Sequence, residues 1–196
     1  SYVLTLLSAP LVGALADAYA WKKRLLALST AGCIAGTAAL WFAGPGALAL
    51  AAVAVIVSNF FFGTGENLIA AFLPELAKSR AMGRVSGWGW SLGYLGGLLS
   101  LGACLAWLAH AKSAGRETAQ AVPETMLITA VLFAVASLPT FLFLRERALP
   151  QASADGIVRT AWARLAATVH HARNFRDLAR FLVCTLFYQA GIAAVI

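Results

Sequence analysis

The sequence predicts an all-α fold: a polytopic transmembrane helix bundle, truncated to four complete spans and two partial ones. Of its 196 residues, 61% are hydrophobic and only 12% are charged, and the mean hydropathy is +0.79. A soluble domain carries about a quarter charged residues. The composition therefore argues against a water-soluble enzyme, and it is too apolar for a disordered chain. Two further observations predict the transmembrane bundle: long uncharged stretches, and an alternation of connections rich and poor in Lys and Arg.

Each predicted span comes from an uncharged stretch. These stretches are Ser1–Ala16, Leu25–Gly65, Val85–Ala109, Thr125–Leu144 and Phe181–Ile196. About 20 apolar residues cross a bilayer, so the longest stretch holds two spans, which Gly44-Pro45-Gly46 separates as a tight hairpin. The predicted complete spans are Leu25–Ala43, Ala47–Ala71, Gly87–Ala109 and Met126–Leu144. The two end stretches are shorter than a span and run into the termini, so we expect an internal part of a longer membrane protein.

The positions of Lys and Arg give the orientation. Thirteen of the 15 lie near 17–24, 74–86 and 145–180, whereas the alternate connections carry only Lys112 and Arg116. Basic residues collect in cytoplasmic loops, so we assign these three connections to the cytoplasm. Because the bases lie at membrane edges, we exclude nucleic acid as a partner; the lipid bilayer is the expected one. A signal peptide is disfavoured, since no basic region precedes the first apolar stretch.

The longest connection divides the chain. Residues 1–144 form the predicted N-terminal transmembrane bundle. Residues 145–180 are a predicted cytoplasmic link, within which Asp155–Asp177 carries an apolar stripe typical of an amphipathic helix on the membrane surface. Residues 181–196 are the predicted start of the first span of a C-terminal bundle.

No pattern in the sequence indicates catalysis, a metal or a cofactor. Cys33, Cys104 and Cys184 each stand alone in an apolar segment, where packing is the usual role of a free cysteine. His170 and His171 are adjacent and so face different sides of a helix, which suits no metal site. No catalytic triad, nucleophile elbow or phosphate-binding loop is present. We therefore predict a protein that is not an enzyme.

Glycines mark one face of the third complete span. Gly89, Gly93 and Gly97 follow one another at four-residue spacing, and Gly96 adjoins them. Small residues at this spacing let helices approach closely in lipid. The stripe predicts helix packing, and the sequence does not separate a static contact from one that slides during transport.

The pair Glu66-Asn67 is the most informative polar feature of the spans. If its helix continues to Pro74, Glu66 lies about two turns inside the cytoplasmic end. An acid at that depth costs about 1–3 kcal/mol unless it faces a bundle interior or a water-filled cavity. Glu66 is therefore either a proton- or cation-coupling group on the solute path or an interfacial carboxylate that reaches the headgroups.

Several motifs resemble those of a known family. The segment from Gly13 to Leu25, GALADAYAWKKRL, resembles the cytoplasmic loop signature G-x-L-A-D-R-x-G-R-[RK]-x-x-L of the major facilitator superfamily. Ala18, Ala20 and Trp21 stand where a base, a glycine and a base are usual. Within the superfamily, LPELA at 73–77 and the glycine-rich run from Gly83 to Gly97 resemble the vacuole-effluxer, Atg22-like branch.

The resemblance extends to FYQAGI at 187–192, which is similar to the seventh helix of this branch, although Ala190 stands where an acid is expected. It implies a major facilitator superfamily-like bundle in which this chain covers helices two to seven of twelve. Gly13, Asp17 and Lys22 would form a gating loop that contacts the missing C-terminal half. Glu66, Asn67 and Gln189 would supply polarity to the substrate or ion pathway.

The predicted function is a secondary active transporter that moves a small polar solute, with an amino acid as the candidate, together with a proton or cation. Alternating access would be the mechanism, and the bacterial inner membrane the location. Two alternatives stay open: a membrane-embedded enzyme and a non-transporting membrane subunit, each with its active residues outside this chain.

Overall fold

The computed structural model describes residues 1–44, 46–147, 156, 159, 162–163, 166–167 and 176–195. The chain divides into two compact units, Ser1–Ala152 and Ser153–Ile196. The division falls inside the predicted 145–180 link. The amphipathic helix predicted over Asp155–Asp177 falls largely outside the described residues.

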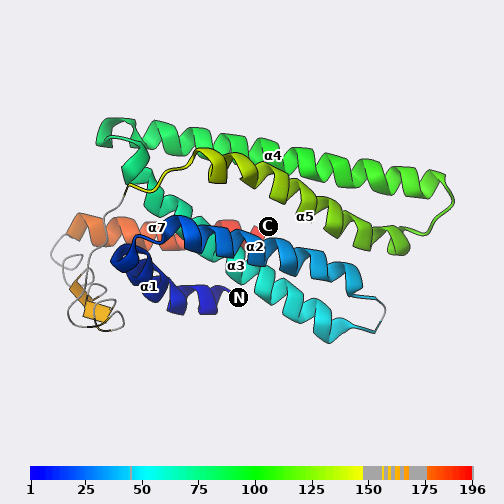
Figure 1. Ribbon diagram of the computed structural model, residues 1–196, viewed down its shortest axis with the longest axis horizontal. Helices are drawn as coiled ribbons and strands as arrows, with labels where there is room; N and C mark the ends of the chain where they lie inside the picture. The colour runs from blue at the N-terminus through cyan, green and yellow to red at the C-terminus, as the bar shows by residue number, and fades with distance from the viewer. Residues whose placement is uncertain are drawn as a thin grey trace. The chain divides into compact units, whose positions relative to one another are not determined.

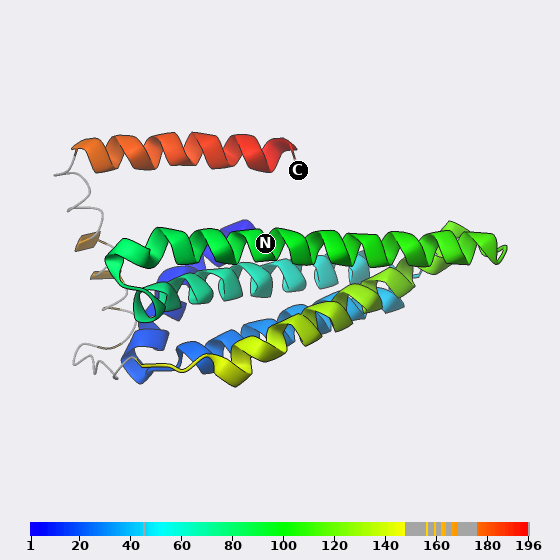
Figure 2. The same cartoon turned by 90° about the horizontal axis from the view of Figure 1, so that it is seen from above.

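The first unit is built from long helices joined by short turns (Figure 1). They are α1 (Tyr2–Tyr19), α2 (Lys22–Ala39, continued by the 3₁₀ turn η1, Leu40–Phe42), α3 (Leu48–Leu76), α4 (Ser79–Ser113) and α5 (Thr118–Phe143). Figure 2 shows that α4 and α5 converge toward the turn that joins them and separate toward their other ends.

Five helices of the described part are long and apolar enough to cross a membrane, which confirms the predicted all-α transmembrane bundle. They are Tyr2–Tyr19, Lys22–Phe42, Leu48–Leu76, Arg80–Ser113 and Thr118–Phe143. The helices extend past the uncharged stretches; α4, for example, runs from Ser79 to Ser113 rather than from Gly87 to Ala109. Charged residues show where a helix leaves the hydrocarbon layer, but they do not show where the helix ends. A helix can continue beyond that point into the headgroup region. For the same reason the first helix includes Asp17 and reaches 18 residues, a full span in length.

The turns use left-handed backbone at three described positions outside the link. Gly46 (φ 95°) and Gly115 (φ 75°) occupy two of them, where glycine carries no steric penalty. The third is Ala20 (φ 51°, ψ 51°), which ends α1 and whose N–H donates to the Ala16 carbonyl. The sharp α1–α2 turn thus depends on an alanine in a conformation that favours glycine.

Helices α2 and α3 approach each other closely. A methyl group placed on Gly32 would lie 2.5 Å from the Phe61 ring, and one on Gly36 would lie 3.0 Å from the Ser58 backbone nitrogen. Gly32-x3-Gly36 is the same small-residue spacing that the sequence showed more prominently in α4. The two glycines let α3 pack directly on the α2 backbone.

The face of α4 that carries the glycine stripe makes few contacts within the first unit. A methyl group on Gly89, Gly93, Gly96 or Gly97 would meet no described atom within 4 Å. Large apolar side chains of α4 are exposed, among them Trp88 and Trp90. The helix packing predicted for these glycines is thus not made by the other helices of the first unit, and it stays a prediction.

The second unit contains α7 (Arg176–Val195). The backbone of the predicted 181–196 segment is helical through Val195. Gln189 lies in this helix, and its side chain falls outside the described residues.

Candidate functional site

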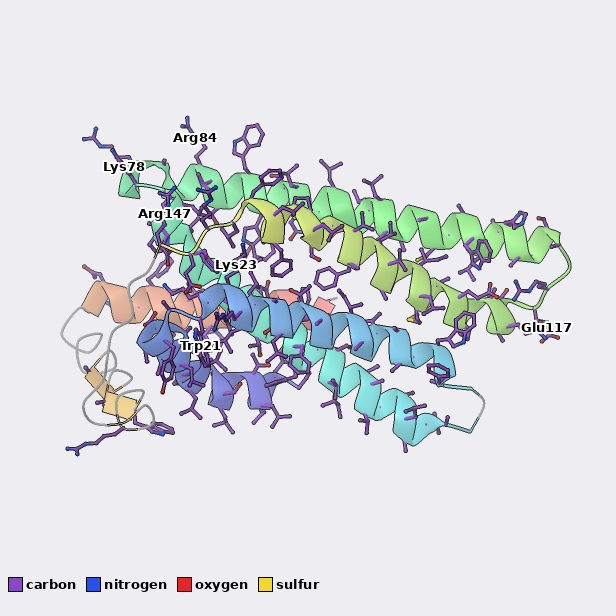
Figure 3. All side chains as sticks on the ribbon, viewed as in Figure 1. Trp21, Lys23, Lys78, Arg84, Glu117 and Arg147 are labelled. Atoms are coloured by element: carbon purple, nitrogen blue, oxygen red, sulfur yellow. The ribbon has the colours of Figure 1, made fainter. Side chains whose placement is uncertain are left out.

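Most basic residues of the first unit lie at one end of the bundle. Figure 3 shows Lys23, Lys78, Arg84 and Arg147 at this end, whereas Glu117 lies at the opposite end. These bases lie in or next to the α1–α2, α3–α4 and post-α5 connections. The same three connections are the ones that the alternation of Lys and Arg assigns to the cytoplasm.

Lys22 forms ion pairs with two acids at this end of the bundle. Its Nζ lies 2.9 Å from Glu75 Oε1 and 3.7 Å from Asp17 Oδ1. The Lys22 side chain is only 12% exposed and that of Glu75 only 15%, whereas that of Asp17 is 37% exposed. The tighter and more buried contact of Lys22 is therefore the one with Glu75. It joins the first residue of α2 to the last turn of α3.

Glu146 supplies the N-terminal cap of α2 from a distant part of the sequence. Its Oε1 accepts the Lys22 N–H at 2.8 Å, and its Oε2 accepts the Lys23 N–H at 3.1 Å. The local residues offer no such cap, because Trp21 makes no side-chain cap bond. A carboxylate at this position satisfies two otherwise unpaired N–H groups and interacts favourably with the positive end of the helix dipole.

A third contact closes a ring. Glu75 Oε2 accepts the N–H of Arg147 at 2.9 Å. The end of α3 is therefore bonded to the start of α2 and to the segment after α5, and that segment is bonded to the start of α2 through Glu146. We refer to Lys22, Glu75, Glu146 and the Arg147 N–H as the charged ring. It ties three helices together at one level.

An apolar cluster supports the charged ring. Its buried members come from α1, α2 and α3 and are Ala16, Leu26, Leu68 and Phe72; Phe141 and Leu144 pack against them from the α5 end. Phe72 is 1% exposed. Because Phe72 lies one turn before Glu75, and Leu26 one turn after Lys22, this packing fixes the helix backbones from which the charged side chains project.

A cavity of about 170 Å³ adjoins Lys22, between α1 and α3. Gly13 and Asp17 line it from α1, and Thr64 and Asn67 line it from α3. The Thr64 hydroxyl donates to the Phe60 carbonyl at 2.8 Å, so its oxygen can still accept a bond from a guest in the cavity. The cavity offers both signs of charge, an amide and a hydroxyl, which is the chemistry that a small polar solute or water requires.

The structure brings some of the site residues predicted from the sequence together and leaves others apart. Gly13, Asp17 and Lys22 line one cavity together with Asn67, which lies far from them in the sequence. Glu66 is exposed and does not line it, because the next residue on a helix points about 100° away.

The opposite end of the bundle has its own ion pair. Arg116 Nη2 lies 2.6 Å from Glu124 Oε1, and Nη1 lies 3.2 Å from Oε2, while Trp107 Nε1 donates to the same Oε2 at 2.6 Å. The hydrogen bond to Glu124 raises the pKa of Arg116. This bidentate pair fastens the turn between α4 and α5. Among the described residues, no cluster of His, Cys, Asp and Glu could hold a metal ion.

Sequence reasoning assigned no role to Glu75 or Glu146. Glu75 was visible in LPELA, three residues before Lys78 in a connection assigned to the cytoplasm. Glu146 lies between two arginines directly after the fourth predicted span. An acid in a basic cytoplasmic connection contributes little to the orientation of the protein in the membrane. The presence of Glu75 and Glu146 in such connections therefore indicated another role, such as pairing with a base.

Comparison with known proteins places these motifs in a family. A family model described as "Vacuole effluxer Atg22 like" matches residues 1–83 and 78–196, which together cover the whole chain. No solved structure matches.

A curated relative is described as an uncharacterized MFS-type transporter, YxiO, of Bacillus subtilis (strain 168). It is 26% identical over 200 residues, and the match takes in 100% of this chain and 46% of the relative. The chain therefore spans about half the length of the curated relative it matches. Together with the five apolar helices, the match supports a multi-pass integral membrane protein in a lipid bilayer.

Proposed function

The chain belongs to the Atg22-like vacuole effluxer family, and on this premise we propose that it is the N-terminal half of a secondary active transporter that exports a small polar solute by alternating access. An amino acid is the candidate solute, with a proton or cation as the coupled ion. The bacterial cytoplasmic membrane is the candidate location, given the Bacillus relative.

The observation that carries this proposal is the position of the charged ring beside the cavity at Asn67. In alternating access, two helix bundles rock as largely rigid bodies around a site between them. The described contacts of the ring lie within one bundle, so they would stiffen this bundle rather than open and close. Asp17, which is more exposed than Lys22, would be the residue that contacts the partner bundle and gates the path.

The cavity would form the cytoplasmic part of the pathway. Asn67 and Thr64 offer hydrogen bonds to a solute, and Lys22 and Asp17 lie at the same cavity wall. Glu66, on the neighbouring face of α3, would be the coupling acid if that face lines the path in the whole protein; otherwise it is an interfacial carboxylate. Gln189 would add polarity from the other bundle.

The experiment is flux of radiolabelled amino acids into proteoliposomes that contain the full-length protein, with and without an imposed pH gradient. We expect gradient-dependent flux, its loss in Glu66→Gln, and its retention in the control Glu117→Gln, which changes an exposed acid at the opposite end. Unchanged flux in Glu66→Gln would leave that carboxylate interfacial. Absence of flux for every amino acid in folded protein would overturn the amino-acid assignment.

A further inference from the structure

A second cavity lies on the other side of the α2 N-terminus, where the α1–α2 turn meets the end of α5. Its volume is about 480 Å³. Three aromatic rings, two bases and one acid line it: Tyr19, Trp21, Phe141, Lys23, Arg24 and Glu146. We refer to it as the aromatic-basic pocket. Its bases take no part in the charged ring.

The pocket has an excess of positive charge. Both carboxylate oxygens of Glu146 accept backbone N–H groups of α2, so the positive end of this helix compensates the acid. Neither Lys23 nor Arg24 forms an ion pair with any residue in the described ranges. The Arg24 guanidinium carbon lies 5.7 Å from the centre of the Trp21 ring, which holds it at the pocket by a cation–π contact. The pocket therefore suits an anion.

The rings and the neighbouring helix surface indicate which anion. Tyr19 and Trp21 stack at 4.9 Å and are 48% and 40% exposed, as is typical of aromatic side chains at the membrane interface. Lys23, Ala27 and Ala31 follow one another at four-residue spacing on α2, and both alanines are exposed. A strip of small apolar residues thus leads from the bases along a membrane-spanning helix, where an acyl chain can lie. A free phosphate has no acyl chain that could contact this strip.

We propose that the aromatic-basic pocket binds the phosphate of an anionic membrane phospholipid in the cytoplasmic leaflet, with an acyl chain along Ala27 and Ala31. Arg24 and Lys23 would hold the phosphate, the former by paired N–H donors and the latter as a point charge. The site goes beyond the proposed transport function and does not depend on it, because lipid can bind whether or not solute moves.

The test is native mass spectrometry of the delipidated full-length protein in a neutral detergent, titrated with phosphatidylglycerol. A micelle without charge removes the general attraction of an anionic membrane surface. At about 1.5 kcal/mol for each charge-assisted hydrogen bond that is lost, the double variant Lys23→Gln/Arg24→Gln should bind phosphatidylglycerol more than about a hundredfold more weakly. The matched control Lys78→Gln/Arg84→Gln removes two bases from the same end of the bundle (Figure 3), and it should bind as the unchanged protein does.

Further arms of the test separate the alternatives. Trp21→Ala keeps both charges and should weaken binding severalfold, while phosphatidylcholine should bind the unchanged protein weakly. Equal losses in the double variant and its control would show general electrostatics and overturn the proposal. Binding of glycerol phosphate as tight as that of the lipid would show a soluble phosphate ester as the ligand and also overturn it. A loss seen only in variants with a lowered melting temperature would do the same.

Discussion

Lys22 Nζ and Glu75 Oε1 lie 2.9 Å apart and join the start of α2 to the last turn of α3. Both side chains are mostly shielded, at 12% and 15% exposure. Exposed ion pairs contribute about 0–1 kcal/mol, whereas loss of one member of a buried pair costs about 3–5 kcal/mol. The Lys22–Glu75 pair lies between these limits, and Glu75 has a second bond, to the Arg147 N–H.

We predict that Glu75→Gln lowers the free energy of unfolding by about 1–3 kcal/mol. Lys22→Met should cost a similar amount, and the double variant less than the sum of the two. The measurement is thermal or denaturant unfolding in detergent for all members of the double-mutant cycle, with an expected coupling of about 1–2 kcal/mol.

The exposed pair Asp177–Arg180 provides the control for this cycle. Its atoms lie 3.6 Å apart, and its side chains are 99% and 77% exposed. Its coupling should be below about 0.5 kcal/mol. Equal coupling energies for the two pairs would show that burial adds nothing to the Lys22–Glu75 contact.

Removal of the Glu146 cap should loosen the start of α2. Glu146→Ala leaves the Lys22 and Lys23 N–H groups without their acceptor, at a cost of about 1–2 kcal/mol. Hydrogen–deuterium exchange should rise at these two amides first. Glu117→Ala is the matched control, because Glu117 precedes α5 without a side-chain cap bond. Faster exchange throughout the bundle, rather than at the start of α2, would contradict a local cap.

Ala20→Gly should stabilise the protein. The left-handed conformation at φ 51° costs a residue with a side chain about 1–2 kcal/mol, and the greater freedom of glycine in the unfolded chain returns about half of this. We expect a net gain of about 0.5–1 kcal/mol. Ala39→Gly, at a right-handed position with φ −62°, should instead destabilise. Unfolding measurements that give the same sign for both variants would show that position 20 is not strained.

The spans and the family could be predicted from local sequence signals. Uncharged length identified the helices, and the alternation of bases predicted which ends lie together. The role of Glu146 could not be predicted in this way, since its partners at 22 and 23 are more than 120 residues away and only the folded bundle brings them into contact. The tight α2–α3 approach was missed for another reason. Its glycine pair lies in a sequence that is less rich in glycine than α4, and glycine frequency does not indicate which helix has a neighbour.

The two glycine motifs should therefore respond differently to a single methyl group. Gly32→Ala places a methyl 2.5 Å from the Phe61 ring, and it should lower the unfolding free energy by about 1–3 kcal/mol because α2 and α3 must separate. Gly93→Ala meets open space in this unit, so it should not destabilise the bundle. If the α4 stripe contacts a helix outside this chain, the bulkier Gly93→Leu will reduce solute flux in the full-length protein while leaving the melting temperature of the bundle unchanged. Unchanged flux in Gly93→Leu would show that α4 presents these glycines to lipid, because lipid chains rearrange around an added side chain whereas a packed helix cannot.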